Sequence, residues 1–391
     1  MPDPILTDVA TATNLREGPA GVEAVVREIV RAGNIRLADA ARGARLPLPV
    51  ATAIRRELEK RGLLQRDHGL ALSETGQRWA RDELGLGEPL QLHIPLRPTH
   101  PLPSQLHLAE STLQDLLTAA PAADVTLDQA PCTAETAIRR AALLYQCGGL
   151  EGRRVLLIGD DDSVSVACAL LGKLVASRPL ARRIMVLDID PKRLSFIRDC
   201  ASRHGVEIET LQHDLRQPLP AELSGAFDTF ITDPPYTLEG AKLFLTRGIE
   251  GIEAGRGQAM FSFGHTAPSQ RIALQATMAE LGLAITALHP GFNSYSGAAI
   301  LGATSELYEL QVHAMAKASE AWTGPLYTAE ANPKQSQYRC LSCSRKWTLG
   351  LKSVPATISE LKEKGCPQCG AKKFDRVTGK KTRDNTFILR T

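Results

Sequence analysis

The sequence lacks the features of membrane, secreted and strongly charged proteins. No apolar run approaches the roughly 20 residues that a membrane-spanning helix needs. The start, Met1 to Leu15, has neither a basic cluster nor an apolar stretch, so no signal peptide is expected. Charge of one sign is also missing, because 46 Lys and Arg face 43 Asp and Glu. That balance is too even to indicate nucleic-acid binding by itself. The content of 43% apolar residues predicts a globular protein. We expect this protein to be cytoplasmic and to have no membrane partner.

Cysteine is infrequent, and half of it is concentrated near the C-terminus. Of 8 Cys, four form two Cys-x-x-Cys pairs separated by 22 residues, and Gly370 permits a tight turn after the second pair. Disulfide frameworks belong mainly to small secreted chains, whereas four thiolates suit a closed, tetrahedral zinc site. We therefore predict a zinc-ribbon-like tail at 321–391, with two disulfides as the alternative. The predicted ligands of one structural zinc per chain are Cys340, Cys343, Cys366 and Cys369. The stretch 385–389 has the pattern of a strand.

The first domain, predicted at 1–81, has the pattern of a winged helix-turn-helix. Helical spacing at 22–30, 35–41 and 47–60 is followed by two short strand-like runs at 62–66 and 69–73. The third helix carries Arg55, Arg56, Lys60 and Arg61. These basic side chains could contact DNA, or they could form a basic surface exposed to solvent. We favour the solvent-exposed surface over a nucleic-acid partner. A connector at 82–128 follows, extended by Pro95, Pro98, Pro101 and Pro103 and containing a helix near 111–119.

The second domain, predicted at 129–320, alternates strands with helices. Strand-like runs lie at 154–159, 183–188, 207–211, 227–233 and 259–263. Such alternation predicts an α/β fold, a Rossmann-like doubly wound parallel sheet. Ligands of such sheets bind at the carboxyl ends of the strands. Acidic residues or glycine follow four of the predicted strands, which points to a ligand site there.

The loop after the first of these strands predicts a cationic ligand. It retains Gly159, which would let the backbone approach a nucleotide, but continues with Asp160, Asp161 and Asp162. The carboxylate of S-adenosylmethionine would be repelled there, since a like-charge contact at 4 Å costs about 4 kcal/mol at an effective dielectric of about 20. Decarboxylated S-adenosylmethionine has lost that group and is a dication. We therefore predict it as the donor, and no redox cofactor.

Further candidate residues follow the other strands. Asp188 is positioned to accept hydrogen bonds from ribose hydroxyls, while Asp190 fits a helix N-cap. Asp214 could meet the adenine amino group, and Gln129 and Thr133, at the start of the domain, are further candidate contacts to the donor. The loop Asp233-Pro234-Pro235-Tyr236 suits an amine: a carboxylate, two prolines that stiffen the backbone and leave carbonyls free, and a ring that can cover a cationic nitrogen.

These motifs resemble known families. Asp233-Pro234-Pro235-Tyr236 is similar to the amine-binding loop of amino-group methyltransferases, whose class I fold is expected here. The loop 157–162 and the strand end 187–190 resemble the corresponding segments of the aminopropyltransferases. Asp162 occupies the position of the loop aspartate that, in that family, receives the aminopropyl ammonium. With the N-terminal domain, the whole of 22–317 resembles the branched-chain polyamine synthases of thermophiles; the tail is not expected from that family.

The resemblance implies a function. The enzyme would transfer aminopropyl groups to the internal secondary amine of spermidine, giving N4-aminopropylspermidine and then N4-bis(aminopropyl)spermidine, with methylthioadenosine released. A homodimer is expected. A protonated amine cannot attack, so a carboxylate must take its proton. We predict Asp162 as this base, with Asp161 and Asp233 orienting donor and acceptor.

Two other functions remain open from the sequence. A methyltransferase acting on amino groups of RNA or DNA would use the Asp233 loop, but the aspartate triplet would then repel its donor. A non-enzymatic nucleic-acid-binding regulator would use both ends of the chain and leave the middle unexplained.

Overall fold

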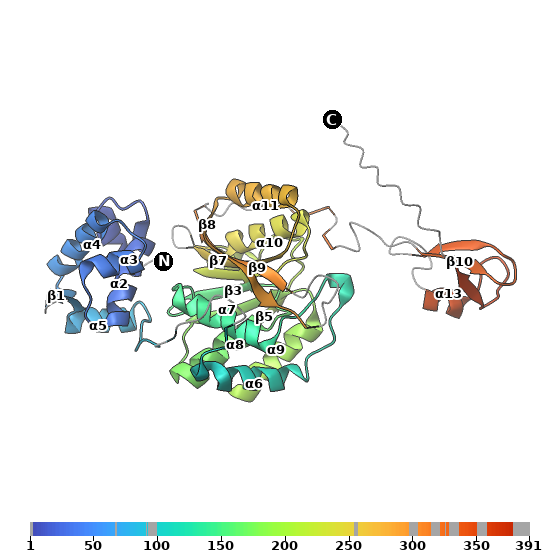
Figure 1. The fold of residues 1–391 in the computed structure, drawn as a ribbon, viewed down its shortest axis with the longest axis horizontal. Helices are drawn as coiled ribbons and strands as arrows, with labels where there is room; N and C mark the ends of the chain where they lie inside the picture. Colours follow the sequence, from blue (N-terminus) through green and yellow to red (C-terminus); the bar gives the residue numbers. More distant parts are fainter. Residues whose placement is uncertain are drawn as a thin grey trace. The chain divides into compact units, whose positions relative to one another are not determined.

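The computed structural model describes most of the chain. The described residues are 3–66, 69–90, 92, 100–253, 257–296, 304–313, 321–324, 326–327, 336–349 and 358–377. They fall into two compact units, Met1–Gly324 and Pro325–Thr391, and each is described by itself (Figure 1). In the described part of the chain, no helix is both long and apolar enough to cross a bilayer. Pro95, Pro98, the boundary at 320 and the stretch 385–389 lie outside the described residues.

The N-terminal residues form a helical bundle with one hairpin. The elements are α1 (Pro4–Ala12), α2 (Gly18–Ala32), α3 (Leu37–Gly43), α4 (Leu48–Lys60), β1 (Leu64–Arg66), β2 (Leu70–Leu72) and α5 (Glu74–Asp82). The helices form because their apolar residues recur at helical spacing and pack into one separate core. The sequence did not predict α1. The second predicted helix begins at Leu37, not at 35, because Ile35 pairs with Leu70 as a β-bridge.

A buried ionic network joins α2 to the sheet-containing part of the same unit. Arg27 Nη2 lies 2.9 Å from Glu23, and Arg27 Nη1 lies 3.5 Å from Glu151. Arg153 reaches Glu23 at 3.0 Å, and Arg178 reaches Glu151 at 2.5 Å. We call these five residues the interdomain cluster. Each of its two carboxylates contacts two guanidinium groups, so the buried negative charge is neutralised within the chain.

A seven-stranded sheet forms the centre of this unit. Its order is β5-β4-β3-β6-β7-β9-β8. The strands are β3 (Arg154–Ile158), β4 (Arg183–Asp188), β5 (Glu209–Gln212), β6 (Thr229–Thr232), β7 (Gln258–Gly264), β8 (Leu283–Ser294) and β9 (Thr304–Val312). All five predicted strands are present and run parallel to one another.

The sheet is mostly parallel rather than wholly parallel, which corrects the prediction. β9 runs antiparallel to both β7 and β8. The sequence did not predict β8 and β9. β8 contains Pro290 and Gly291 and has two shifts of register, so its sequence lacks the alternation that identifies a strand.

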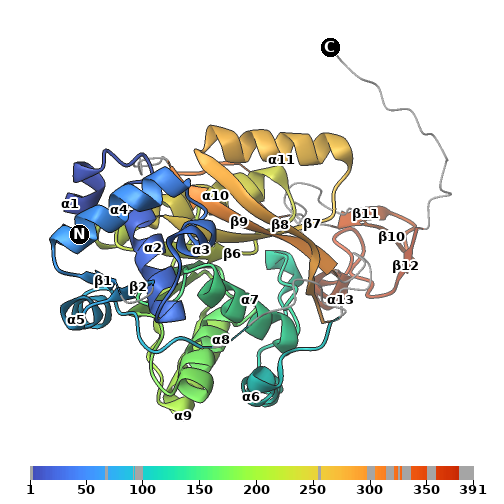
Figure 2. The ribbon, with the colours of Figure 1, turned by 60° about the vertical axis from the view of Figure 1, so that its left-hand side comes forward.

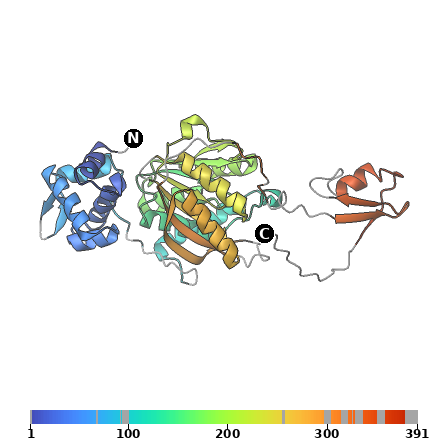
Figure 3. The same cartoon turned by 90° about the horizontal axis from the view of Figure 1, so that it is seen from above.

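Helices cover both faces of the sheet. α7, α8 and α9 lie together on one face, and α10 and α11 lie on the other (Figures 1 and 3). The helical elements are η1 (Ser104–Leu106), α6 (His107–Leu117), η2 (Val125–Leu127), α7 (Ala134–Gln146), α8 (Val164–Leu170), η3 (Leu171–Ala176), α9 (Pro191–His204), η4 (Ala221–Leu223), α10 (Leu238–Gly251) and α11 (Pro268–Glu280). Because β3 lies between β4 and β6 and runs parallel to both, the loops that follow these three strands leave the sheet at the same end. Figure 2 shows α7, α8 and α9 together on one side of the sheet.

The second unit contains a small antiparallel sheet and one helix. The elements are β10 (Ser336–Cys340), β11 (Lys346–Leu349), α13 (Ile358–Lys364) and β12 (Phe374–Arg376), with strand order β11-β10-β12. Its two Cys-x-x-Cys pairs lie in the turn after β10 and in the segment after α13.

Candidate functional site

The loop after β3 divides its three aspartates between two directions. Gly159 has a φ of 72°, a left-handed conformation that glycine adopts without strain. The Asp160 carboxylate turns to the start of α8, where it accepts hydrogen bonds from the amides of Val164 (2.7 Å) and Ser165 (3.1 Å). These contacts favour a helix-capping role over the predicted donor-binding role. Asp160 is thus engaged at the start of α8, which leaves Asp161 and Asp162 of the three carboxylates that the charge argument assumed.

Asp161 and Asp162 turn toward α7 and the segment before it. The amide of Ala130 donates to Asp161 Oδ2 (2.9 Å), and the amide of Cys132 donates to Asp162 Oδ1 (2.5 Å). Asp162 Oδ2 accepts a hydrogen bond from Arg140. Both oxygens of Asp162 are thus engaged, whereas Asp161 Oδ1 has no partner among the described residues.

Asp233 lies next to these residues because β6 neighbours β3 in the sheet. Its Oδ2 accepts hydrogen bonds from Arg140 Nη2 (2.9 Å) and from the Tyr295 hydroxyl (2.6 Å). Its Oδ1 accepts no hydrogen bond within the described part of the chain. Among the described residues, Asp233 therefore has one oxygen without a hydrogen-bond partner, whereas each oxygen of Asp162 has a partner.

The rest of the Asp233 loop is more closed than expected. Pro234 and Pro235 are buried, and the Pro235 carbonyl accepts a hydrogen bond from the Thr237 amide (2.7 Å). That carbonyl is satisfied within the loop, which corrects the expectation that it faces a ligand. The Tyr236 hydroxyl donates to Tyr295 (2.7 Å), and its ring lies 5.3 Å from that of Phe263.

Arg140, on α7, connects the two acidic loops. Its guanidinium contacts Asp162 and Asp233, and its Nε donates to Asn293 Oδ1 (2.7 Å). The side chain is only 1% exposed. We call Asp161, Asp162, Asp233 and Arg140 the carboxylate cluster. Arg140 contacts two of these carboxylates and Asp161 lies near both of them, so these four residues together are net negative when the carboxylates are ionised.

Burial changes the proton affinities of these groups. It raises the pKa of Asp233 to about 6, although Arg140 acts in the opposite direction. Burial, together with the charges of Asp162 and Asp233, raises the pKa of Asp161. Burial raises the pKa of Asp160 to about 7. The pKa of Tyr295 is raised well above its ordinary value by burial and by Asp233, so its hydroxyl remains a donor at neutral pH.

The predicted ribose-binding residue lies at the end of β4 and is held by the backbone. Asp188 accepts hydrogen bonds from the amides of Asp160 (3.1 Å) and Asp190 (2.8 Å). Asp190 caps α9 through the amide of Lys192, as predicted, and also accepts a hydrogen bond from Gln129 (3.0 Å). Gln129 thus lies beside the end of β4.

The remaining predicted donor contacts lie at different places. Asp214 follows β5 and is ion-paired with Arg216 at 2.9 Å. Partial burial by itself would raise the pKa of Asp214. The hydrogen bonds from Arg216 have the larger effect, so the pKa of Asp214 lies below its usual value. Thr133 caps α7 by accepting a hydrogen bond from the amide of Thr136 (3.2 Å). Neither residue contacts the carboxylate cluster through a hydrogen bond or an ion pair.

Sequence reasoning missed three polar residues of the site. Arg140 lies in a helix whose neighbours are mostly apolar, and Tyr295 and Asn293 lie at the end of the unpredicted β8. The available signal was the pair Arg139 and Arg140 among the apolar positions of a helix, because a buried charge needs a partner. Ser163 also has a positive φ of 57°, is fully buried, and its hydroxyl has no partner among the described residues.

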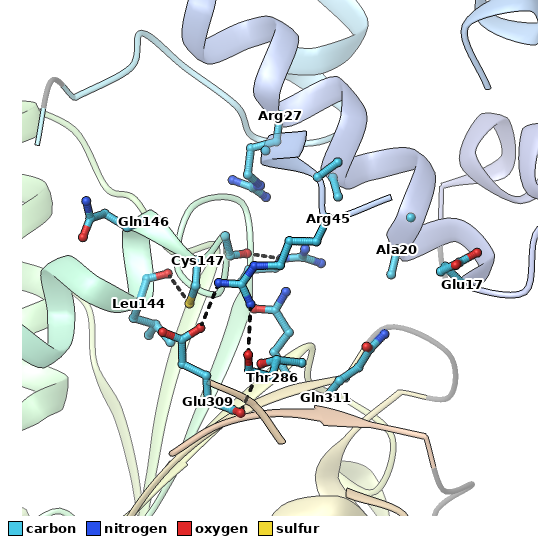
Figure 4. Close-up of a pocket in the computed structure, with 18 of the residues that line it drawn as sticks. Glu17, Ala20, Arg27, Arg45, Leu144, Gln146, Cys147, Thr286, Glu309 and Gln311 are labelled. Atoms are coloured by element: carbon cyan, nitrogen blue, oxygen red, sulfur yellow. Dashed lines mark hydrogen bonds and ion pairs between the residues drawn. The ribbon is translucent and has the colours of Figure 1, made fainter. Parts of the chain in front are cut away.

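A separate cavity lies at the opposite ends of the strands. Its volume is about 370 Å³, and it is lined by α2, the segment before α4, the end of α7, and β7 to β9 (Figure 4). Arg45 reaches toward Glu309 (3.8 Å) and the Thr286 carbonyl (3.5 Å). Its lining mixes arginines and glutamates, and it contains none of the predicted site residues.

The four tail cysteines converge on one point. Their Sγ atoms all lie within 4.8 Å of one another, with Cys340–Cys369 at 3.6 Å and Cys343–Cys366 at 3.7 Å. All four are free thiols, so the alternative of two disulfides is not observed. Gly370 has a φ of 73°, as expected of the tight turn after the second pair. The cluster could hold a metal ion.

Comparison with known proteins identifies the family. Residues 110–335 match the model of the branched-chain polyamine synthase A C-terminal domain. An uncharacterized protein of Methanocaldococcus jannaschii is 33% identical over 388 residues, which are 97% of this chain and 94% of that one. The N(4)-bis(aminopropyl)spermidine synthase of Thermus thermophilus is 32% identical over 297 residues, 74% of this chain and 81% of that one.

A solved structure agrees with this match. The branched-chain polyamine synthase of Thermus thermophilus, in complex with N4-aminopropylspermidine and 5'-methylthioadenosine, has a TM-score of 0.53 and 28% identity. The similarity covers 83% of this chain and 98% of that one. The family that the sequence motifs predicted is therefore confirmed: this chain belongs to the branched-chain polyamine synthases.

Proposed function

We propose that the protein transfers aminopropyl groups from decarboxylated S-adenosylmethionine to the internal secondary amine of spermidine. As a member of its family, the chain is a transferase that forms branched-chain polyamines. The products are N4-aminopropylspermidine and N4-bis(aminopropyl)spermidine, with methylthioadenosine released at each transfer. The observation that carries the proposal is the net negative carboxylate cluster at the carboxyl ends of β3 and β6, since donor and acceptor are both polycations.

Each transfer is a displacement at carbon. The lone pair of the acceptor nitrogen attacks the aminopropyl carbon bonded to the sulfonium, the C–N bond forms, and the C–S bond breaks. Its electron pair stays on sulfur, which leaves as the neutral thioether of methylthioadenosine. An amine in water is mostly an ammonium ion without a lone pair, so a carboxylate must first accept its proton.

We propose Asp233 as this base, in place of Asp162. The free Oδ1 of Asp233 can accept an N–H from the acceptor, while its Oδ2 is fixed by Arg140 and Tyr295. The oxygens of Asp162 are already bonded to Cys132 and Arg140. Asp162 then supplies charge and holds the loop, and Asp161, with one free oxygen, is the candidate for the donor ammonium. Tyr236 would cover the acceptor.

For the donor's nucleoside, we keep the predicted contacts as proposals with one addition. Gly159, Asp188 and Gln129 lie around the ends of β3 and β4, which suits the ribose and its neighbourhood. Asp214 stays the proposed adenine contact, and Thr133 a further one. The unpartnered hydroxyl of Ser163 is a candidate that the sequence did not suggest.

We also propose that the tail holds one structural zinc ion. Four sulfur atoms at 2.3 Å from a tetrahedral zinc lie about 3.8 Å apart, which is close to the 3.6 and 3.7 Å separations in the tail. Zinc bound by four thiolates has no open position and would stabilise the fold of this small unit.

The zinc proposal predicts a specific loss. Cys366→Ser should lower bound metal from one equivalent to near zero and unfold the tail, because the remaining thiolates form an incomplete site. The measurements are elemental analysis and limited proteolysis, with Cys147→Ser as the matched control outside the cluster. Freshly purified, reduced protein without zinc would contradict the proposal.

We propose a winged-helix class for the N-terminal domain, supported by the order α2, α3, α4 and the β1–β2 hairpin. DNA binding is not favoured. Arg55 and Lys60 on α4, and Arg61 just after it, are ion-paired with Glu57 or Glu59 of that helix, which reduces the positive charge available for phosphates. A homodimer and a cytoplasmic location remain predictions from the sequence.

A transfer assay tests the proposed function. Protein incubated with decarboxylated S-adenosylmethionine and spermidine should yield two products, one and two aminopropyl groups heavier, with equal methylthioadenosine. Calorimetric titration should show weaker binding of S-adenosylmethionine, whose carboxylate meets Asp161 and Asp233. Methyl transfer from S-adenosylmethionine to RNA or DNA, without any polyamine product, would overturn the proposal.

A further inference from the structure

Arg140 occupies a place in α7 where an arginine is costly. The helix is buried along most of its length, and Arg140 itself is 1% exposed. Removing a guanidinium from water is unfavourable unless its charge and hydrogen-bond donors are all satisfied. Here four of its five N–H donors bond to acceptors from three other parts of the chain, and two of these acceptors are carboxylates: Asp162, Asp233, Asn293 and Tyr295.

The geometry gives this arginine a specific relation to the two acidic loops. Nη1 is bonded to Asp162 in the loop after β3, and Nη2 to Asp233 Oδ2 in the loop after β6. The Nε is fixed by Asn293, whose amide donates to Ser262 (3.1 Å) and Ser305 (2.8 Å). The planar guanidinium is thus held on three sides, which fixes the orientation of both carboxylates.

The positive charge of Arg140 also affects the protonation of Asp233. Two neighbouring buried carboxylates repel each other, so one of them tends to hold a proton. A protonated Asp233 could not take a proton from the acceptor. Burial raises the pKa of Asp233 and Arg140 lowers it, so the guanidinium favours the ionised carboxylate, whose Oδ1 has no partner among the described residues.

We propose that Arg140 is a positioning residue for aminopropyl transfer. It acts through Asp233, by turning Oδ1 toward the acceptor amine and by keeping the carboxylate ionised before a polycation arrives. This inference rests on the proposed function. The titratable and charged groups around Asp233 are Cys132, Arg140, Asp161, Asp162, Tyr236 and Tyr295.

The experiment compares pH–rate profiles of the whole protein with spermidine as acceptor. Arg140→Gln should lower kcat at pH 7 at least about 10-fold and move the acidic limb of the profile upward by about one pH unit or more, because the cation is lost. Arg140→Lys keeps the charge but cannot bridge two carboxylates. Its limb should stay near that of the unaltered protein while kcat falls, and KM for spermidine should change little in both variants.

Tyr295→Phe provides a second test in case Arg140→Gln fails to fold. It removes the neutral donor to Asp233 Oδ2 and leaves the charge in place, so the limb should move upward by less than in Arg140→Gln. Circular dichroism and thermal melting establish folding for each variant.

The outcomes separate this inference from the proposed function. If kcat falls by the same factor at every pH in both Arg140 variants, or if no folded variant moves the limb, Arg140 is only a structural support and the inference is wrong. If the unaltered protein transfers no aminopropyl group to spermidine, the proposed function itself fails.

Discussion

The carboxylate cluster and the interdomain cluster are both buried ionic networks, but they balance charge in opposite ways. In the interdomain cluster, Glu23 and Glu151 share three guanidinium groups. In the carboxylate cluster, Arg140 alone serves Asp162 and Asp233, with Asp161 beside them. One network has cations in excess, and the other has carboxylates in excess.

The difference indicates which network needs a ligand. A buried carboxylate without a partner is costly, and the interdomain cluster meets that need within the chain. The carboxylate cluster does not, and part of its negative charge stays on oxygens without a hydrogen bond, such as Asp233 Oδ1. A polycationic substrate would complete the balance. Charge balance, rather than the number of ionisable residues, therefore distinguishes a site from a structural support here.

The largest expected effect comes from breaking the carboxylate cluster. Asp233→Asn removes the proposed base and should slow transfer to spermidine by at least about 10²-fold. The fold should persist, because an amide fills the same space. Methylthioadenosine release, followed under single-turnover conditions, gives the rate.

Asp199→Asn is the matched control, because Asp199 is exposed on α9. It should transfer at the unaltered rate. If Asp233→Asn retains near-normal turnover while Asp162→Asn does not, the base is Asp162, as the sequence first suggested.

Breaking the interdomain cluster should affect stability and leave the chemistry in place. Arg27→Met removes one of the two guanidinium groups that contact each of Glu23 and Glu151. Since Arg153 and Arg178 remain, the loss of stability should be at most about 3–5 kcal/mol, which is the cost of a buried charge left without any partner. Denaturant unfolding measures the free energy of unfolding, and kcat per folded molecule should be unchanged.

Arg36→Met is the control for that prediction. Its partner Asp39 lies at the surface, and the arginine is 81% exposed, so no measurable loss of stability is expected. A normal stability of Arg27→Met combined with a lower kcat would show that the interdomain cluster belongs to the catalytic machinery.

The smallest effect concerns Asp160 and depends on pH. Its pKa in the folded state is about 7, raised by burial from an ordinary value of 3.8. A raised pKa means that the protonated form favours folding, so this contribution is complete below about pH 4 and is lost as the pH rises through 7. Asp160→Asn lacks this titration. As the pH rises from 5 to 8, the free energy of unfolding of Asp160→Asn should therefore increase relative to that of the unaltered protein by roughly 3 kcal/mol. This figure corresponds to about two pH units at 1.36 kcal/mol each.

Urea unfolding at the two pH values measures this difference. Parallel pH dependence in the two proteins would mean that Asp160 is ionised throughout, and the division of the loop into a capping aspartate and two site aspartates would have to be revised.

Much of the site could be predicted because it follows single strands. Asp233 comes directly after the apolar run of β6, Asp162 lies in the short loop after that of β3, and parallel strands place their carboxyl ends at one edge. The cysteine pairs were likewise visible from spacing, since each Cys-x-x-Cys turn is a local structure. These features depend on residues close together in the chain, and the family resemblance rested on them.

The tertiary structure decided which atoms of these residues are available. No local pattern shows that Asp160 caps α8, that Arg140 lies between Asp162 and Asp233, or that Tyr295, just after the irregular strand β8, reaches Asp233. The sequence by itself determined where the carboxylates stand along the chain, because strand ends are local. The fold determined their partners, because a buried charge is stabilised by groups that reach it through space from α7 and β8, far away in sequence.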